Sequence, residues 1–316
     1  MPPMPLTEAV PTRDRLSGRR SWDPATTARA LSVPSVGLVL LAVVASPLLP
    51  SGAGPTVLVA AGLVGLPHGA VDHLALGWAR GRTGAAPAAV LLGYALAAVV
   101  AAVASLAAPV PALLVLLVLS AAHFAEGERA FDRLRGGTGG WLPAVALGTC
   151  VVFVPLVLRP GSSRPLLAAL DPGLPDLLLE IRTPLLLGCL ALVLAGLVAS
   201  VHRPQVAAEL AVVAVACLLT APLVVFGVWF ACWHSPRHLV RLAALEPDGD
   251  GRQRAGRLVR GAVGPTVVAL VGLGILVLLL GALPGALLIV LLALTVPHAA
   301  VVARLDRIAS GATSES

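Results

Sequence analysis

Six of the seven histidines in this sequence fall in or at the ends of long apolar stretches, where a titratable ring is costly and usually functional. Two of them, His234 and His238, stand four residues apart at the end of an apolar run. Positions i and i+4 of a helix share one face, so both rings can bind the same metal ion. The spacing alone is common by chance, but its setting in an apolar segment makes it a candidate metal site.

Three other apolar segments each add a histidine, and in two of them a carboxylate that could support it follows within five residues. His68 and Asp72 are four residues apart, so Asp72 is expected to orient either His68 or a neighbouring ligand. His123 is followed by Glu128, whose carboxylate is a candidate hydrogen-bond partner of the site. His298 stands alone in the last segment, where a single histidine more often supports a ligand than binds metal. We therefore expect Asp72, Glu128 and His298 to support the metal site.

The candidate ligands are His68, His123, His234 and His238. Four neutral imidazoles without a thiolate suit a first-row metal such as iron, copper or zinc. Because the surroundings are apolar, we expect Fe²⁺ at this site to act with O₂ on an apolar substrate. Zinc-dependent hydrolysis would want a polar substrate and a path for water, and no haem-attachment motif occurs in the sequence.

Other polar residues near these motifs have simpler interpretations. His73 lies further round its helix and is expected to face elsewhere, at the interface or beside a ligand. His202 and Glu126 are expected to be solvated. Arg237 and Arg241 are interpreted as positive anchors at the cytoplasmic ends of spans.

The composition identifies a membrane protein, because 58% of the residues are hydrophobic and 12% are charged, against about 45–50% and about 25% in soluble domains. Apolar runs of about 20 residues recur, each long enough to cross about 30 Å of hydrocarbon. We expect an all-α, polytopic transmembrane bundle of about ten helices, within a range of 8–10. The predicted segments are 33–50, 55–79, 86–107, 111–126, 141–158, 183–201, 206–220, 222–241, 262–281 and 284–303. The seventh and eighth are the least distinct, because they are separated only at Thr220-Ala221-Pro222.

Arginine placement predicts the orientation of the bundle. With the N-terminus inside, 19 of the 22 arginines fall in cytoplasmic segments. Both termini are therefore expected to be cytoplasmic, with the histidines in the cytoplasmic half of their segments. Residues 1–32 and 306–316 are predicted to be disordered, and 33–305 to form one transmembrane catalytic domain. The stretch 159–183 is predicted to be the longest outside loop, with an interfacial helix near 174–180.

Four short motifs resemble those of one known family and occur in the family's order. They are Gly-Leu-Pro-His-Gly-Ala-Val-Asp at 65–72, His-Phe at 123–124, His-Ser-Pro-Arg-His at 234–238 and Thr-Val-Pro-His at 295–298. The chain resembles the Brp/Blh family of membrane β-carotene 15,15'-dioxygenases over about residues 55–305. Where relatives have an aspartate five residues after the second motif's histidine, this chain has Glu128.

The resemblance implies a non-haem Fe²⁺ held by His68, His123, His234 and His238. It implies cleavage of the central double bond of β-carotene by O₂ into two molecules of all-trans-retinal, with a microbial rhodopsin as a possible recipient. It also implies a multi-pass protein of the cell membrane. A long apolar polyene dissolves in the bilayer, so such a substrate can enter sideways between helices. Trp229, Phe230 and Trp233 are then candidate walls of the substrate channel or parts of the core.

The sequence leaves other functions open. A transporter would be expected to have broken helices and central carboxylates, with access from both sides. A retinal-handling or metal-handling membrane protein without catalysis would keep the same motifs. A di-iron hydroxylase would need about eight or more clustered histidines, as those enzymes use histidine-rich sets, and the chain has seven.

Overall fold

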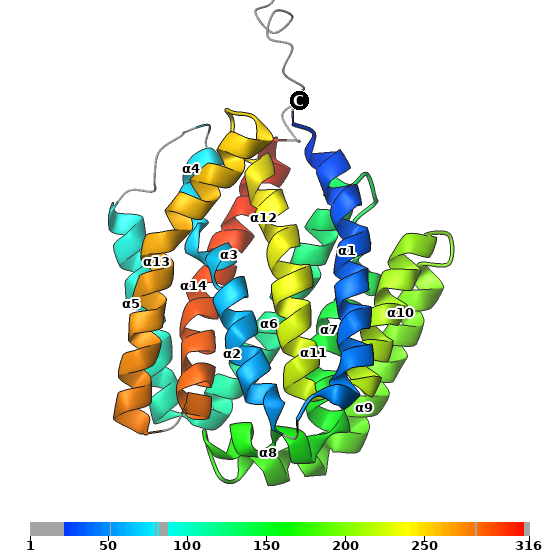
Figure 1. Cartoon of the computed structure of the whole chain (residues 1–316), viewed down its shortest axis with the longest axis vertical. Helices are drawn as coiled ribbons and strands as arrows, with labels where there is room; N and C mark the ends of the chain where they lie inside the picture. Colours follow the sequence, from blue (N-terminus) through cyan, green and yellow to red (C-terminus); the bar gives the residue numbers. More distant parts are fainter. Residues whose placement is uncertain (1–21, 51, 80, 82–87, 282, 313–316) are drawn as a thin grey trace, which may run out of the picture.

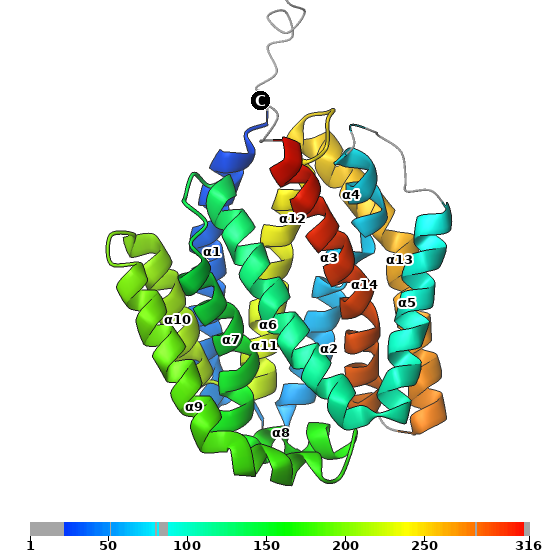
Figure 2. The same ribbon diagram turned by 180° about the vertical axis from the view of Figure 1, so that it is seen from behind.

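The computed structural model describes residues 22–50, 52–79, 81, 88–281 and 283–312. The helices of this part of the chain form one bundle (Figures 1 and 2). They are α1 (Pro24–Ala45), η2 (Ser46–Leu48), α2 (Ala53–Gly65), α3 (Pro67–Ala70), α4 (Asp72–Trp78), α5 (Ala88–Ala107), α6 (Pro109–Leu134), α7 (Trp141–Leu158), α8 (Pro160–Ala168), α9 (Leu174–Ala199), α10 (Pro204–Leu219), α11 (Pro222–Trp229), η3 (Phe230–His234), α12 (Ser235–Ala244), α13 (Gly251–Leu280) and α14 (Leu283–Ala312).

The predicted all-α bundle is confirmed. Eight of the described helical stretches are long and apolar enough to cross a membrane, and α10 is a shorter apolar helix. The seventh and eighth predicted segments are separate, because Thr220 is extended and Pro222 begins a new helix. Helix α8 lies across one end of the bundle, and α1 begins and α14 finishes at the opposite end (Figure 1). These are called the α8 end and the termini end below.

The outside of the bundle is apolar, as a lipid-facing surface requires. Helix α13 has none of its most apolar stretch buried, and Leu278 there is 85% exposed. Leu92 on α5 is 71% exposed. In water such surfaces would cost free energy, so the fold suits a multi-pass membrane protein.

Several predicted boundaries differ from the structure. Helix α1 begins at Pro24, because the Asp23 carboxylate accepts hydrogen bonds from the Ala25 and Thr26 amides. Residues 24–32 are therefore helical, whereas 1–21 lie outside the described residues. Helix α14 continues to Ala312, so most of the predicted C-terminal tail is helical and only 313–316 lie outside.

The predicted loop 159–183 is also largely helical. It contains α8 and the first turns of α9, which runs without interruption from Leu174 to Ala199. Pro184 lies inside α9 and does not end it. The stretch 174–180 is therefore the start of a long helix and not a separate interfacial one.

Two of the spanning segments are interrupted beside the histidine motifs. The second segment is divided into α2, α3 and α4, with Pro67 opening α3 and Val71 leaving helical geometry. The eighth contains the π-helical segment η3, in which the Ser235 amide bonds to the Phe230 carbonyl, five residues back. Pro236 has no N–H to give the preceding turn, and the wider π turn precedes it. Both interruptions place a histidine away from a regular helical position.

Close contact between α6 and α7 depends on a glycine. At Gly148 a side chain would collide with the main-chain carbonyl oxygen of Ala121, which cannot move without its helix. Val151 and Cys150, on the same helix, are almost fully buried in the main core cluster. The α6–α7 contact fixes α6, which carries His123.

We expect Gly148→Ala to lower the free energy of unfolding by about 1–3 kcal/mol, because overpacking forces two helices apart. Thermal unfolding in detergent micelles measures this change. Gly188→Ala on α9 is the matched control, since nothing lies within 4 Å of the added carbon there. Equal unfolding temperatures for the two variants would contradict the packing role of Gly148.

Candidate metal centre

Five histidine rings converge inside the bundle, each from a different helical element. They are His68 on α3, His123 on α6, His234 at the end of η3, His238 on α12 and His298 on α14. All five are buried, with exposed fractions between 2% and 7%. Ring centroids of neighbouring members lie from 4.6 Å (His123 to His298) to 6.1 Å (His123 to His238) apart. The structure thus brings together the four predicted ligands and adds His298.

The nitrogen atoms of these rings point into a shared space. The nearest ligand atoms of His68, His123 and His234 all lie within 4.8 Å of one another, and so do those of Asp72, His238 and His298. The His298 Nε2 atom is 3.2 Å from the His123 Nε2 atom. Such separations suit nitrogen atoms arranged around one cation.

In two of the rings, a hydrogen bond to one nitrogen atom leaves the other nitrogen atom available to bind a metal. The His68 Nδ1 atom lies 2.6 Å from the Gly65 carbonyl oxygen. A carbonyl only accepts, so Nδ1 carries the proton and Nε2 is left as a ligand atom. A side chain at Gly65 would collide with the Phe230 ring, so glycine lets α2 approach η3 here. This local geometry orients His68.

Asp72 supports His298 and not His68. The His298 Nδ1 atom lies 2.8 Å from the Asp72 Oδ2 atom, which selects one of the two partners that the sequence allowed. Tyr94, the only tyrosine of the chain, also interacts with Asp72. A carboxylate on one ring nitrogen leaves the other as a basic ligand atom, the arrangement common at metal sites.

Several ring nitrogens of the cluster have no hydrogen-bond partner within the described part of the chain. They are His234 Nε2, His238 Nδ1 and His238 Nε2. A buried polar atom without a partner costs free energy, and a bound cation would remove that cost for nitrogen atoms facing it. The donor set is nitrogen-rich and thiolate-free, so the residues present fit a borderline first-row metal.

Glu128 does not contact the histidines. Its carboxylate accepts hydrogen bonds from Trp233 Nε1 at 3.0 Å and from Arg237 Nη1 at 2.7 Å. Both donors are the immediate sequence neighbours of the histidine pair, and neither lines the cavity described below. Glu128 therefore ties α6 to the segment that carries His234 and His238.

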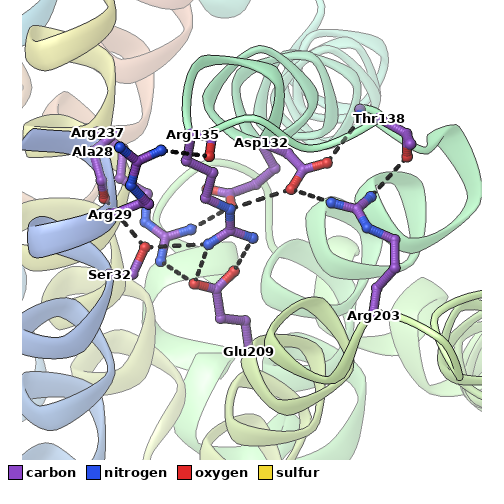
Figure 3. Close-up of polar contacts among 11 residues, drawn as sticks. Ala28, Arg29, Ser32, Asp132, Arg135, Thr138, Arg203, Glu209 and Arg237 are labelled. Atoms are coloured by element: carbon purple, nitrogen blue, oxygen red, sulfur yellow. Dashed lines mark hydrogen bonds and ion pairs between the residues drawn. The ribbon is translucent and has the colours of Figure 1, made fainter. Parts of the chain in front are cut away.

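Arg237 belongs to a buried network of charges, and its interpretation as a surface anchor is wrong. It is 2% exposed, and its Nη2 atom also donates to Glu209 Oε1 at 3.0 Å. Glu209 in turn accepts two hydrogen bonds from Arg135, at 2.7 and 2.9 Å. Figure 3 shows Glu209 between the two guanidinium groups. Arg135 continues the chain of contacts to Asp132, and Arg203 donates to the same carboxylate.

The network keeps its charges in balance. Three arginines face three carboxylates, and Arg135 also donates to the Ser32 hydroxyl of α1. Burial lowers the pKa of Arg135, but the hydrogen bonds and charge of Glu209 outweigh it and hold the pKa above its usual value. Sequence reasoning missed Glu209, although an acid inside the apolar run 206–220 was a visible signal.

The remaining polar residues near the motifs lie outside the cluster. His73 hydrogen-bonds to the Ala70 carbonyl and stands outside the five-ring cluster. Glu126 is partly exposed and pairs with Arg129, and His202 is exposed, as expected. Arg241 is buried and pairs with Asp306, so it too is more than a surface anchor.

A cavity of about 520 Å³ adjoins the histidines, within the range of small-molecule sites. Its wall includes His68, His123 and His298, and nearly all the rest of the wall is apolar. Phe230 lines it, whereas Trp229 and Trp233 are fully buried in the core cluster and do not. Of the aromatic residues considered as channel walls, only Phe230 has that position.

A comparison with models of known protein families finds one match. The family is described as beta-carotene 15,15'-dioxygenase, and the match covers residues 59–306. The chain belongs to this family. The matched region holds all five clustered histidines and the residues of the cavity wall except Leu58. Comparisons with curated proteins and with solved structures gave no match.

Removing the shared carboxylate of the charge network should destabilise the fold. Glu209→Ala leaves Arg135 and Arg237 without their common partner, and breaking a buried ion pair costs about 3–5 kcal/mol. Thermal unfolding of the purified protein in micelles measures the loss. Asp176→Ala is the control, because its pair with Arg164 is exposed and should contribute little. A similar small effect of both variants would show that the network does not hold the bundle together.

Proposed function

We propose that the chain is an iron-dependent β-carotene 15,15'-dioxygenase, which cleaves the central double bond with O₂ and releases two molecules of all-trans-retinal. The observation that carries this proposal is a cluster of five buried imidazoles, three of which line an apolar cavity. Membership of the family supports a carotenoid as the substrate.

The proposed ligands of Fe²⁺ are His68, His123, His234 and His238. Bound Fe²⁺ would supply the activation of O₂. Imidazole ligands add no negative charge to the site, which suits contact with a hydrocarbon. The chain's own contribution is to hold these rings at fixed angles, through the Gly65 carbonyl and the two interrupted helices.

The cavity would bind the polyene and exclude water. Phe226 and Phe230 lie with their rings stacked at 6.1 Å along its wall, beside His68. Such rings pack against the flat chain of conjugated bonds and limit its rotation. Cleavage of a C=C bond by O₂ into two carbonyl groups needs no net proton transfer, so no general acid or base is required.

His298 and Asp72 form the part of the site that the sequence described least well. The Asp72 carboxylate holds the His298 ring with its Nε2 atom among the nitrogen atoms of the cluster. We propose that this pair supports the metal, with His298 close enough to serve as a further ligand.

The bundle is proposed to lie in the cell membrane with both termini in the cytoplasm. Arg29, near the start of α1, donates a hydrogen bond to the carbonyl of Arg135 at the end of α6, so both arginines lie toward the termini end, in keeping with an excess of positive charge on the inner side. Retinal is apolar and would pass into the bilayer, where a microbial rhodopsin is a possible recipient.

Loss of one ligand should abolish the reaction. Expressed in bacteria that make β-carotene, the wild type should form retinal and His234→Ala should form none, because the metal loses a ligand. Retinal is measured by chromatography of extracted pigments. His202→Ala, an exposed histidine, is the control and should match the wild type. If the wild type retains its carotene and forms no retinal, the proposed dioxygenase activity is refuted, and a metal-handling or retinal-handling protein is favoured.

Loss of the supporting carboxylate should lower the affinity for the metal without abolishing metal binding. Asp72→Asn should reduce metal affinity by about 10–100-fold, because the His298 ring loses its charged partner. Competition with a chelator measures this affinity independently of turnover. Asp248→Asn changes an exposed carboxyl and should leave the affinity unchanged. A metal affinity of Asp72→Asn equal to that of the wild type would contradict the proposed role of the Asp72–His298 pair.

A further inference from the structure

The residues that line the cavity fall into two sets on either side of the histidines. One set comes from the parts of α2, α6, α7, α11 and α14 that lead toward α8, and includes Leu166 and Leu167 of α8 itself. The other set comes from α5 and α13, with Tyr94 and Ala269 as examples. His123 and His298 lie where the two sets meet. The cavity therefore has two arms, called here the α8 arm and the α5–α13 arm.

The α8 arm is closed by buried side chains. Leu166 and Leu167 are 8% and 3% exposed, and Val151 and Leu116 are equally enclosed. All four side chains belong to core clusters that pack the bundle on this side. A long molecule that reaches this arm must stop beneath α8.

The α5–α13 arm is open on its outer side. Val268 on α13 lines the cavity and is nevertheless 72% exposed, and Leu91 on α5 lines it and is 44% exposed. Ala95 and Pro265 are likewise both exposed and part of the wall. A residue that borders the cavity and also the outside surface stands at the rim of an opening.

The packing of the helices explains the opening. Helices α5 and α13 both pack on α14, but they share no extensive contact with each other. Both lie at the same edge of the bundle in the two views (Figures 1 and 2). The rim residues are apolar. Pro265 lies fourteen positions into the long helix α13, so the rim is at a depth where a membrane-spanning helix contacts hydrocarbon. The opening therefore faces hydrocarbon.

From this geometry we infer that an apolar polyene enters the cavity laterally from the bilayer, between α5 and α13, and comes to rest with its leading half in the α8 arm. This inference rests on the proposed function for the identity of the polyene. Its trailing half then occupies the α5–α13 arm, and the middle of the chain lies beside His123 and His298. The two arms thus present a central bond to the metal site.

Two matched pairs of substitutions test this route. Val268→Trp and Leu91→Trp put a large ring at the rim from opposite helices. Val267→Trp and Leu92→Trp put the same ring on neighbouring exposed positions, at 52% and 71% exposure, that do not border the cavity. β-Carotene is added, in the absence of oxygen, to purified protein in lipid vesicles. The carotenoid bound to the protein is then extracted and quantified at successive times.

We expect the two rim variants to take up β-carotene about tenfold more slowly than the wild type, with unchanged metal content. The two neighbouring variants should take it up at the wild-type rate. Rim variants that match their neighbours would overturn the route, as would a wild type that binds no β-carotene. If the wild type takes up β-carotene but forms no retinal with iron and oxygen, the proposed function fails while the uptake rates still decide the route.

Discussion

The structure depends on a single constraint, which is that imidazole nitrogens inside an apolar bundle need partners other than water. Two of the five clustered rings have one nitrogen fixed, by the Gly65 carbonyl and by the Asp72 carboxylate. One ligand atom from each of His68, His123 and His234 lies within 4.8 Å of the other two, and so do those of Asp72, His238 and His298. A cation there would satisfy several buried nitrogens at once, since His234 Nε2 and both nitrogens of His238 have no hydrogen-bond partner in the described part of the chain.

The unusual features of the backbone serve this cluster. The break before His68 and the π turn before Ser235 both occur where the chain is buried or lines the cavity, the places where a membrane protein tolerates irregular helices. Behind the cluster, Glu128 and Glu209 hold Arg237, which lies between the two histidines of the opening motif. The charged network therefore positions this segment while none of these three side chains lines the apolar cavity.

Much of this arrangement was predictable from residue types and spacing. The apolar runs predicted the bundle, and the expected position of the histidines in the cytoplasmic half of their segments predicted that His68, His123, His234 and His238 would meet. The pairing of His298 with Asp72 could not be predicted, because a lone histidine carries no spacing signal and the two residues are far apart in the sequence. Glu128 was expected to support a histidine but binds Trp233 and Arg237, since side-chain direction across helices cannot be read from spacing.

The central claim, that the histidine cluster holds an iron on which carotene cleavage depends, is tested most directly by exchanging the metal. The purified protein is stripped with a chelator, reloaded with Fe²⁺ or Zn²⁺, and supplied with β-carotene and O₂ while retinal is measured. The account predicts no retinal from the stripped protein, recovery with Fe²⁺, and none with Zn²⁺, which binds similar ligands but has no redox chemistry. Equal retinal formation by the stripped or zinc-loaded protein would contradict it.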